Sequence, residues 1–173
     1  EGDDAPALAP PPEDAPRDKI RPIPTLLISA FLALQILIPI RGLFYPGRAA
    51  WTGEGEWFAW RMKLNDKVCS SVFTVTNGKT GDAREVDPAE HLNSRQAQTM
   101  VLNPDITLQF AGYLESLELA HAEKEDIKVT AAIDCSLNGR PVQPLVDETR
   151  DLTNLRRSWR HYDWLRQLEI PLR

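Results

Sequence analysis

The stretch IKVTAAIDCSLNG at residues 127–139 decides the fold class of this chain. Apolar side chains occupy every second position along it, at Ile127, Val129, Ala131, Ile133, Cys135 and Leu137. A period of two residues predicts a strand with one buried face. Asn138 and Gly139 can then adopt the two positive φ angles of a tight hairpin turn. Pro141 and Pro144 follow in the returning strand, and because proline lacks an amide donor, this strand is predicted at a sheet edge.

An earlier hairpin is predicted in residues 67–86. Cys69, Phe73 and Val75 lie at alternate positions and are candidates for a buried strand face. The segment NGKTG at 77–81 is a strong turn signal. Residues 83–86 are then predicted to return as the partner strand.

The sequence between the two hairpins has helical signals. Asn103 can cap a helix, Pro104 suits its first turn, and Asp105 suits its positive end. One apolar stripe then recurs at helical spacing, at Ile106, Phe110, Tyr113, Leu114 and Leu117. A shorter helix is predicted at 94–101, and another at 155–168 in a basic sequence that holds two tryptophans. We therefore expect an α+β domain of two β-hairpins around a helix pair.

The segment PIPTLLISAFLALQILIPI at 22–40 carries no charge and is bracketed by Arg21 and Arg41. A helix needs about 20 apolar residues to cross a bilayer, so a single transmembrane helix is predicted, with Pro39 at its end. One alternative is a buried helix of a soluble protein, which rarely lacks a polar face for this long. The other is a cleaved signal peptide, which fits the long acidic segment before it poorly. More basic residues precede the span than follow it, which favours a cytoplasmic N-terminus and an external domain.

The formal net charge of −5 comes from the first 18 residues, where six acids stand against one arginine. This part is also rich in proline, which predicts a disordered tail. The remaining 19 acids and 19 bases cancel, and this balance argues against a nucleic-acid surface. The predicted organisation is a tail at 1–21, a transmembrane helix at 22–40, an aromatic collar at 41–66 and an α+β extramembrane domain at 67–173.

The aromatic collar contains six rings, at Phe44, Tyr45, Trp51, Trp57, Phe58 and Trp60. Such rings favour the interface between membrane and water, so an interfacial belt is one interpretation. The other is a wall for an apolar cofactor or peptide. Both remain open from the residues alone.

Cys69 and Cys135 are the two cysteines of the chain. They could pair in an oxidising compartment, or be small buried apolar groups in a reducing one. His91, His121 and His161 have no metal-type spacing, so no metal site is predicted. There is no glycine-rich phosphate loop and no nucleophile elbow in the sequence, and we expect no catalytic residue in this chain.

Eight stretches in order along the chain resemble a known family. They are LIPIRGLFYPG at 37–47, WTGEGEWFAWRMKL at 51–64, NGKTG at 77–81, VDP at 86–88, SRQ at 94–96, PDITLQFAGYL at 104–114, SLNGRPVQPLVD at 136–147 and WLRQL at 164–168. They are similar to the vitamin K-dependent gamma-glutamyl carboxylases, and most of all to the bacterial relatives with horizontally transferred transmembrane domains. The tryptophan-rich collar is the most specific part of this resemblance.

The resemblance implies a multi-helix membrane protein in which this region follows the late membrane helices. Animal members use reduced vitamin K, oxygen and carbon dioxide to carboxylate peptide glutamates, with a catalytic lysine in earlier membrane segments that nothing here matches. In the collar, which is linked to glutamate handling, Trp60 and Met62 match family residues. Gly55, Glu56 and Asn65 differ from the animal enzymes, and Glu56 would repel an anionic glutamate unless it is paired.

On this basis a substrate or partner surface is predicted at Trp51, Trp57, Trp60, Arg61 and Arg140. The tryptophans would line a mouth above the helices. The arginines would meet an anionic substrate or headgroup, or else serve as structural ion-pair partners. No cofactor is expected in this chain, and reduced vitamin K or another quinone would belong only to a full carboxylase-like protein.

Two functions follow as hypotheses. The chain is the C-terminal membrane-anchored domain of a carboxylase-like protein, without a catalytic base of its own. Alternatively, it is a non-catalytic single-span subunit that scaffolds a larger membrane complex. Both predict the bilayer and other transmembrane helices or membrane-protein subunits as partners, no nucleic acid, and a bacterial inner-membrane location with a periplasmic domain.

Overall fold

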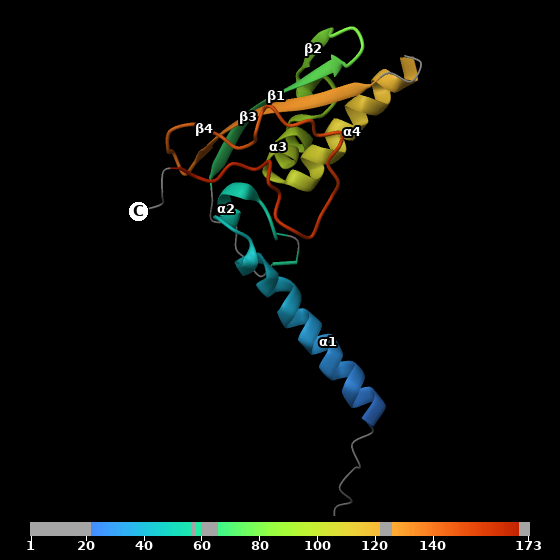
Figure 1. The fold of residues 1–173 in the computed structure, drawn as a ribbon. Coiled ribbons are helices and arrows are strands. Elements are labelled where there is room, and N and C mark those ends of the chain that lie inside the picture. Colours follow the sequence, from blue (N-terminus) through green and yellow to red (C-terminus); the bar gives the residue numbers. More distant parts are fainter. Residues whose placement is uncertain (1–21, 57, 60–65, 122–125, 170–173) are drawn as a thin grey trace, which may run out of the picture. The chain divides into compact units, whose positions relative to one another are not determined.

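The centre of the fold is one antiparallel sheet of four strands (Figure 1). The computed structural model describes residues 22–56, 58–59, 66–121 and 126–169. The strands are β1 (Lys67–Asn77), β2 (Ala83–Val86), β3 (Ile127–Leu137) and β4 (Gln143–Pro144), in the order β2-β1-β3-β4. Both predicted hairpins are confirmed, and pairing of β1 with β3 along their whole length joins them into a single sheet.

The hairpin turn between β3 and β4 has the backbone that its sequence predicted. Asn138 has φ 52° and Gly139 has φ 70°. The short β4 contains Pro144 and pairs only with β3 among the described strands, so it lies at the edge of the sheet as expected.

The predicted helix pair covers one face of the sheet (Figure 1). Helix α3 (Ser94–Leu102) begins with a capping box, in which the side chains of Asn93 and Gln96 each accept a hydrogen bond from the other's backbone N–H. Helix α4 (Pro104–His121) follows directly, and the Asn103 side chain accepts from the Asp105 N–H at 3.0 Å. A short 3-10 turn, η2 (Pro88–Glu90), precedes α3.

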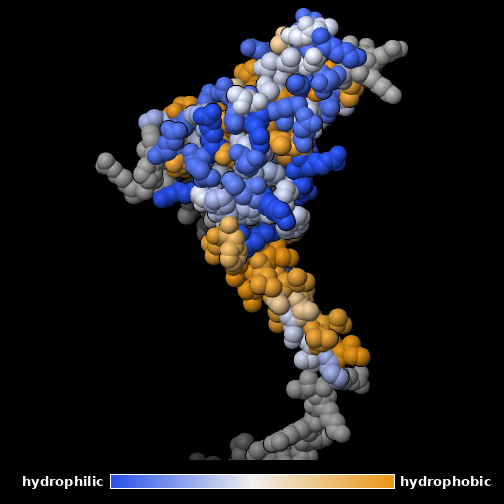
Figure 2. Space-filling view, in the orientation of Figure 1, coloured by the Kyte–Doolittle hydropathy of each residue, from blue (hydrophilic) through white to orange (hydrophobic). Residues whose placement is uncertain are grey.

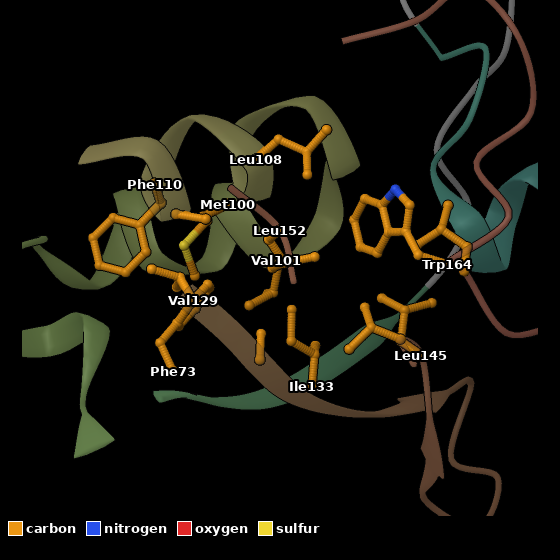
Figure 3. Close-up of a cluster of buried hydrophobic side chains, with 14 of the residues drawn as sticks. Phe73, Met100, Val101, Leu108, Phe110, Val129, Ile133, Leu145, Leu152 and Trp164 are labelled. Carbon is orange, nitrogen blue, oxygen red and sulfur yellow. The ribbon is translucent and has the colours of Figure 1, made fainter. Parts of the chain in front are cut away.

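The core lies between this helix pair and the sheet (Figure 3). Phe73 of β1 meets Phe110 of α4 edge to face, with ring centroids 4.9 Å apart. Leu108 and Ala111 of α4 are also buried, so the buried face of this helix is wider than the predicted stripe. Tyr113, at the margin of that stripe, is exposed.

The prediction of a helix at 155–168 is wrong, because the structure has no helix in this segment. Its last part instead runs extended beside the segment that follows β4, with an isolated bridge between Val146 and Leu165. The Asp147 N–H donates to the Trp164 carbonyl, and the Arg166 N–H donates to the Leu145 carbonyl, both at 2.8 Å. These hydrogen bonds between the two segments satisfy backbone groups that a helix would have paired internally.

The apolar segment forms helix α1 (Pro22–Ile40), followed by the 3-10 turn η1 (Arg41–Phe44) and the short helix α2 (Ala49–Thr52). None of the 19 residues of α1, all of them described, is buried, unlike a core helix of a soluble protein. The stretch Pro22–Phe44 is long and apolar enough to cross a membrane, as an anchor or a signal sequence would be. Its surface is mostly hydrophobic in Figure 2.

The chain divides into two compact units, one up to Gln35 and one from Ile36 onward. The last turn of α1 and all the elements after it belong to the second unit. The predicted disordered tail at 1–21 lies outside the described residues.

Candidate functional site

The described part of the aromatic collar packs against the C-terminal segment. Trp51 in α2 is completely buried, and its indole N–H donates to the Arg166 carbonyl at 2.8 Å. The buried Lys67 ammonium donates to the Trp51 carbonyl and lies 5.4 Å from its ring centroid. Trp51 is therefore placed within the core and not on an exposed surface.

Helix α2 ends at a glycine whose backbone no other residue could adopt without strain. Gly53 has φ +75°, and a Cβ there would lie 2.3 Å from the Leu102 carbonyl oxygen. This close approach brings the collar onto the junction between α3 and α4. The next residue, Glu54, enters the interior at this point.

Glu54 is the buried acid of the collar, with only 2% of its surface exposed. Its carboxylate accepts the Tyr162 N–H at 2.7 Å. The Nδ1 atom of His161 lies 2.9 Å and 3.0 Å from its two oxygens. A buried carboxylate is tolerated only when it is well hydrogen-bonded, so Glu54 attaches the collar to the C-terminal segment.

A second buried acid continues this network. The Tyr162 hydroxyl donates to Asp105 Oδ1 at 2.5 Å and accepts the Ser158 N–H at 2.8 Å. The Arg157 guanidinium meets Asp105 Oδ2 at 3.1 Å. Burial raises the pKa of Tyr162 well above 10, and its bond to Asp105 raises it further. The hydroxyl therefore stays a donor in the folded state, and its stabilising effect is lost only above pH 10, where the unfolded chain ionises.

A small cleft of about 70 Å³ lies beside this network, between the collar and residues 157–162. The Tyr45 hydroxyl donates to the Trp159 carbonyl at 2.5 Å. The Arg41 guanidinium carbon lies 4.8 Å from the centroid of the Trp159 ring. Phe58 and Trp159, which both line this cleft, are 74% and 70% exposed.

Of the five residues predicted to form a substrate or partner surface, the structure describes Trp51 and Arg140. Trp57, Trp60 and Arg61 lie outside the described residues. Arg140 lies in the turn between β3 and β4, where its guanidinium donates to the Leu137 carbonyl at 3.1 Å. Among the described residues, no hydrogen bond or ion pair joins Arg140 to Trp51.

Sequence reasoning missed four residues of this region: Glu54, Asp105 as an ion-pair partner, Tyr162 and Trp159. One signal could have indicated Glu54, because an acid between two glycines in an aromatic segment is a candidate for burial. No local signal indicated its partners, since His161 is 107 positions away along the chain.

The two cysteines face each other on the central strands. Cys69 of β1 and Cys135 of β3 are paired in register, with Cα atoms 4.1 Å apart, and form a disulfide. Cys135 is buried, and Cys69 packs against the same core. Disulfides persist in oxidising compartments, so this bond is typical of a domain outside the cytoplasm.

The acids of the site have structural partners. Glu54 and Asp105 both accept hydrogen bonds from the C-terminal segment. In the part of the chain that the structure describes, no group of three or more His, Cys, Asp or Glu side chains could hold a metal ion.

Together these features define a class: a disulfide-bonded, extracytoplasmic α+β domain that follows an apolar helix. The family model for the lumenal domain of vitamin K-dependent gamma-carboxylase matches residues 20–170. The chain belongs to this family, which confirms the resemblance seen in its motifs. No curated protein and no solved structure gives a match to this chain.

Proposed function

We propose that this chain is the membrane-anchored extracytoplasmic domain of a carboxylase-like membrane protein, with no catalytic base of its own. Its task is to hold the aromatic collar in a fixed position at the bilayer surface. One observation carries the proposal: the segment that follows the apolar helix is attached to the distant C-terminal segment through the buried carboxylate of Glu54. A solvent-exposed linker would not need a buried acid in this position.

Among the described residues, the two buried acids of this site are used in structural bonds, which supports a domain without a catalytic base of its own. A catalytic base must be available to take a proton from substrate. The carboxylates of Glu54 and Asp105 are occupied by the backbone of Tyr162, its hydroxyl and the side chain of Arg157. We therefore assign catalysis in a carboxylase-like protein to residues outside this domain.

The described cleft does not fit a quinone. Sites for small organic ligands usually enclose about 300–1,000 Å³, whereas the cleft beside the collar encloses about 70 Å³. Reduced vitamin K or another quinone is therefore not assigned to this cleft. A substrate surface at Trp57, Trp60, Arg61 and Arg140 stays a prediction, with Trp51 supporting the collar from inside the core.

A second candidate function is a single-span scaffolding or docking subunit of a larger membrane complex. Helix α1 favours this function because it carries small and polar side chains at Ser29, Ala30, Ala33 and Gln35. Small residues let transmembrane helices approach closely, and polar ones bond across the interface. The intact mass of the native polypeptide separates the two functions: further hydrophobic spans in one chain support the enzyme domain, and their absence supports the subunit.

The membrane anchor is tested in a bacterial host that expresses the full chain. The anchored chain should stay with the membrane after alkaline carbonate extraction. Protease added outside spheroplasts should digest the domain, as expected for a periplasmic location in the inner membrane.

The double variant Leu27→Arg/Leu34→Arg should release the chain, because a charge at the centre of a span costs about 2.5–3.5 kcal/mol. The matched control Ser29→Ala should stay bound. Release of the unmodified chain by carbonate would refute the anchor, and protection of the domain from external protease would reverse its orientation.

A further inference from the structure

We propose that residues 156–160, Arg-Arg-Ser-Trp-Arg, form a second membrane contact that binds anionic phospholipid headgroups at the bilayer surface. This inference rests on the proposed membrane anchor and adds a lipid-binding surface to it. The segment lies more than 100 residues beyond α1 in sequence. The fold nevertheless returns it to the residue at which the apolar helix ends.

The return is defined by two contacts within one compact unit. Arg41 is the first residue after α1, and its guanidinium lies over the Trp159 ring at 4.8 Å. Tyr45, four residues later, donates its hydroxyl to the Trp159 carbonyl at 2.5 Å. If α1 crosses the bilayer, the level of Arg41 is the level of the membrane surface, and Trp159 lies there as well.

The segment is attached to the core on one side and exposed to solvent on the other. Tyr162 and Glu54 anchor its base through the buried network. All five residues from 156 to 160 are nevertheless exposed, and Trp159 presents 70% of its surface. Phe58 lines the same cleft as Trp159 and is also exposed. Tryptophan with neighbouring arginine is the usual composition at the boundary of a bilayer.

Charge decides the kind of headgroup. The five residues contain three arginines, and Arg41 adds a fourth cation beside them. Asp105 is paired with Arg157, and Glu54 is buried against His161. The positive charge of this surface therefore comes from Arg156, Arg160 and Arg41. An arginine-rich aromatic surface at the membrane edge is complementary to phosphate-bearing anionic lipid.

The test uses the full chain in nanodiscs of phosphatidylcholine alone or of an equal mixture with phosphatidylglycerol. Amide hydrogen exchange of residues 154–161 is followed by mass spectrometry in both. Each arginine near an anionic surface favours association by a factor of about five. Exchange of this segment should therefore be slower in the anionic discs, and high salt should remove the difference because it screens surface charge.

The variant Arg156→Gln/Arg160→Gln should reduce the protection from exchange in anionic discs by a factor of up to about 25. It leaves the Arg157 pair with Asp105 intact. The control Arg95→Gln/Lys128→Gln removes the same charge from exposed positions on α3 and β3 and should keep the protection. Thermal melts of all the variants identify any that fail to fold. A second measurement is the quenching of tryptophan fluorescence by brominated lipid, which Trp159→Phe should reduce.

The outcomes separate the two proposals. Exchange that is equal in neutral and anionic discs, or that changes equally in both double variants, would overturn the lipid contact alone. A chain that leaves the discs under carbonate would overturn the anchor and the contact that rests on it. Protection that needs phosphatidylglycerol and the two arginines supports the inference.

Discussion

Replacement of Glu54 by alanine should destabilise the domain more than replacement of any exposed acid. The change removes the acceptor of the buried Tyr162 N–H, which lies 2.7 Å from the carboxylate. A buried donor left without a partner costs about 1–3 kcal/mol. The pair with His161 adds at most about 1 kcal/mol, because the histidine side chain is 32% exposed and solvent screens it.

The expected loss in the free energy of unfolding is therefore about 1–4 kcal/mol for Glu54→Ala. A domain of this size loses about 3–5 °C in melting temperature for each kcal/mol, so the melting temperature should fall by about 3–20 °C. Glu54→Gln keeps an oxygen that can accept the Tyr162 N–H. It should lose only about 1 kcal/mol, since a neutral acceptor is weaker than a charged one.

The assay is a thermal melt followed by near-ultraviolet circular dichroism, which reports the packing of the tryptophans, with the full chain in detergent. Glu148→Ala is the matched control, because Glu148 is an exposed acid in the loop after β4. An exposed substitution of this kind changes stability by about 0.5 kcal/mol at most. Equal melting temperatures for Glu54→Ala and Glu148→Ala would refute the structural role of the buried carboxylate.

Three further predictions concern other parts of the domain. Reduction of the Cys69–Cys135 bond, which spans 66 residues, should cost about 4 kcal/mol by loop entropy; a melt that is indifferent to reductant would contradict the pairing. Tyr162→Phe should cost about 1–2 kcal/mol by denaturant titration, because Asp105 loses a donor, and an unchanged midpoint would argue against the bond. The pKa of Asp147 is lowered by the Thr149 hydroxyl and N–H, so its stabilising effect is present above pH 3.8 and lost as the pH falls through the folded-state pKa. Thr149→Ala should raise that pKa in an NMR titration, and an unmoved value would rule out the hydroxyl as its main cause.

Local patterns predicted most of the secondary structure because they report the surroundings of neighbouring residues. Alternation along Ile127–Leu137 corresponds to a strand with one buried face, and Asn138-Gly139 forms its turn. The cap at Asn103 marks the start of α4. These signals act within a few residues, so no knowledge of the rest of the chain is needed to interpret them.

The segment at 155–168 was predicted wrongly for the opposite reason. Tyr162, Trp164 and Leu165 are all buried, and Tyr162 and Leu165 have the i, i+3 spacing of one helix face. Their burial comes from contacts with α2 and with the segment after β4, where Val146 pairs with Leu165. A local helical pattern could not show which surfaces would cover them.

The candidate site depends even more on tertiary structure. Trp51 looked like an interfacial ring because its neighbours are aromatic, yet it lies in the core and bonds to Arg166. Glu54 looked like one acid among several in the collar, yet it binds residues more than 100 positions away. A residue's neighbours in sequence do not determine whether it meets water or another segment.

The sequence by itself determined the apolar helix, the two hairpins, the helix pair and the family of this protein. These are consequences of local periodicity, turn chemistry and motif order, which the chain carries whether or not it has folded. Only the tertiary structure decided that Cys69 meets Cys135 and that Arg-Arg-Ser-Trp-Arg at 156–160 returns to the end of α1. The physical reason is that long-range contacts depend on which apolar surfaces pack together, and that choice is made by the whole core at once.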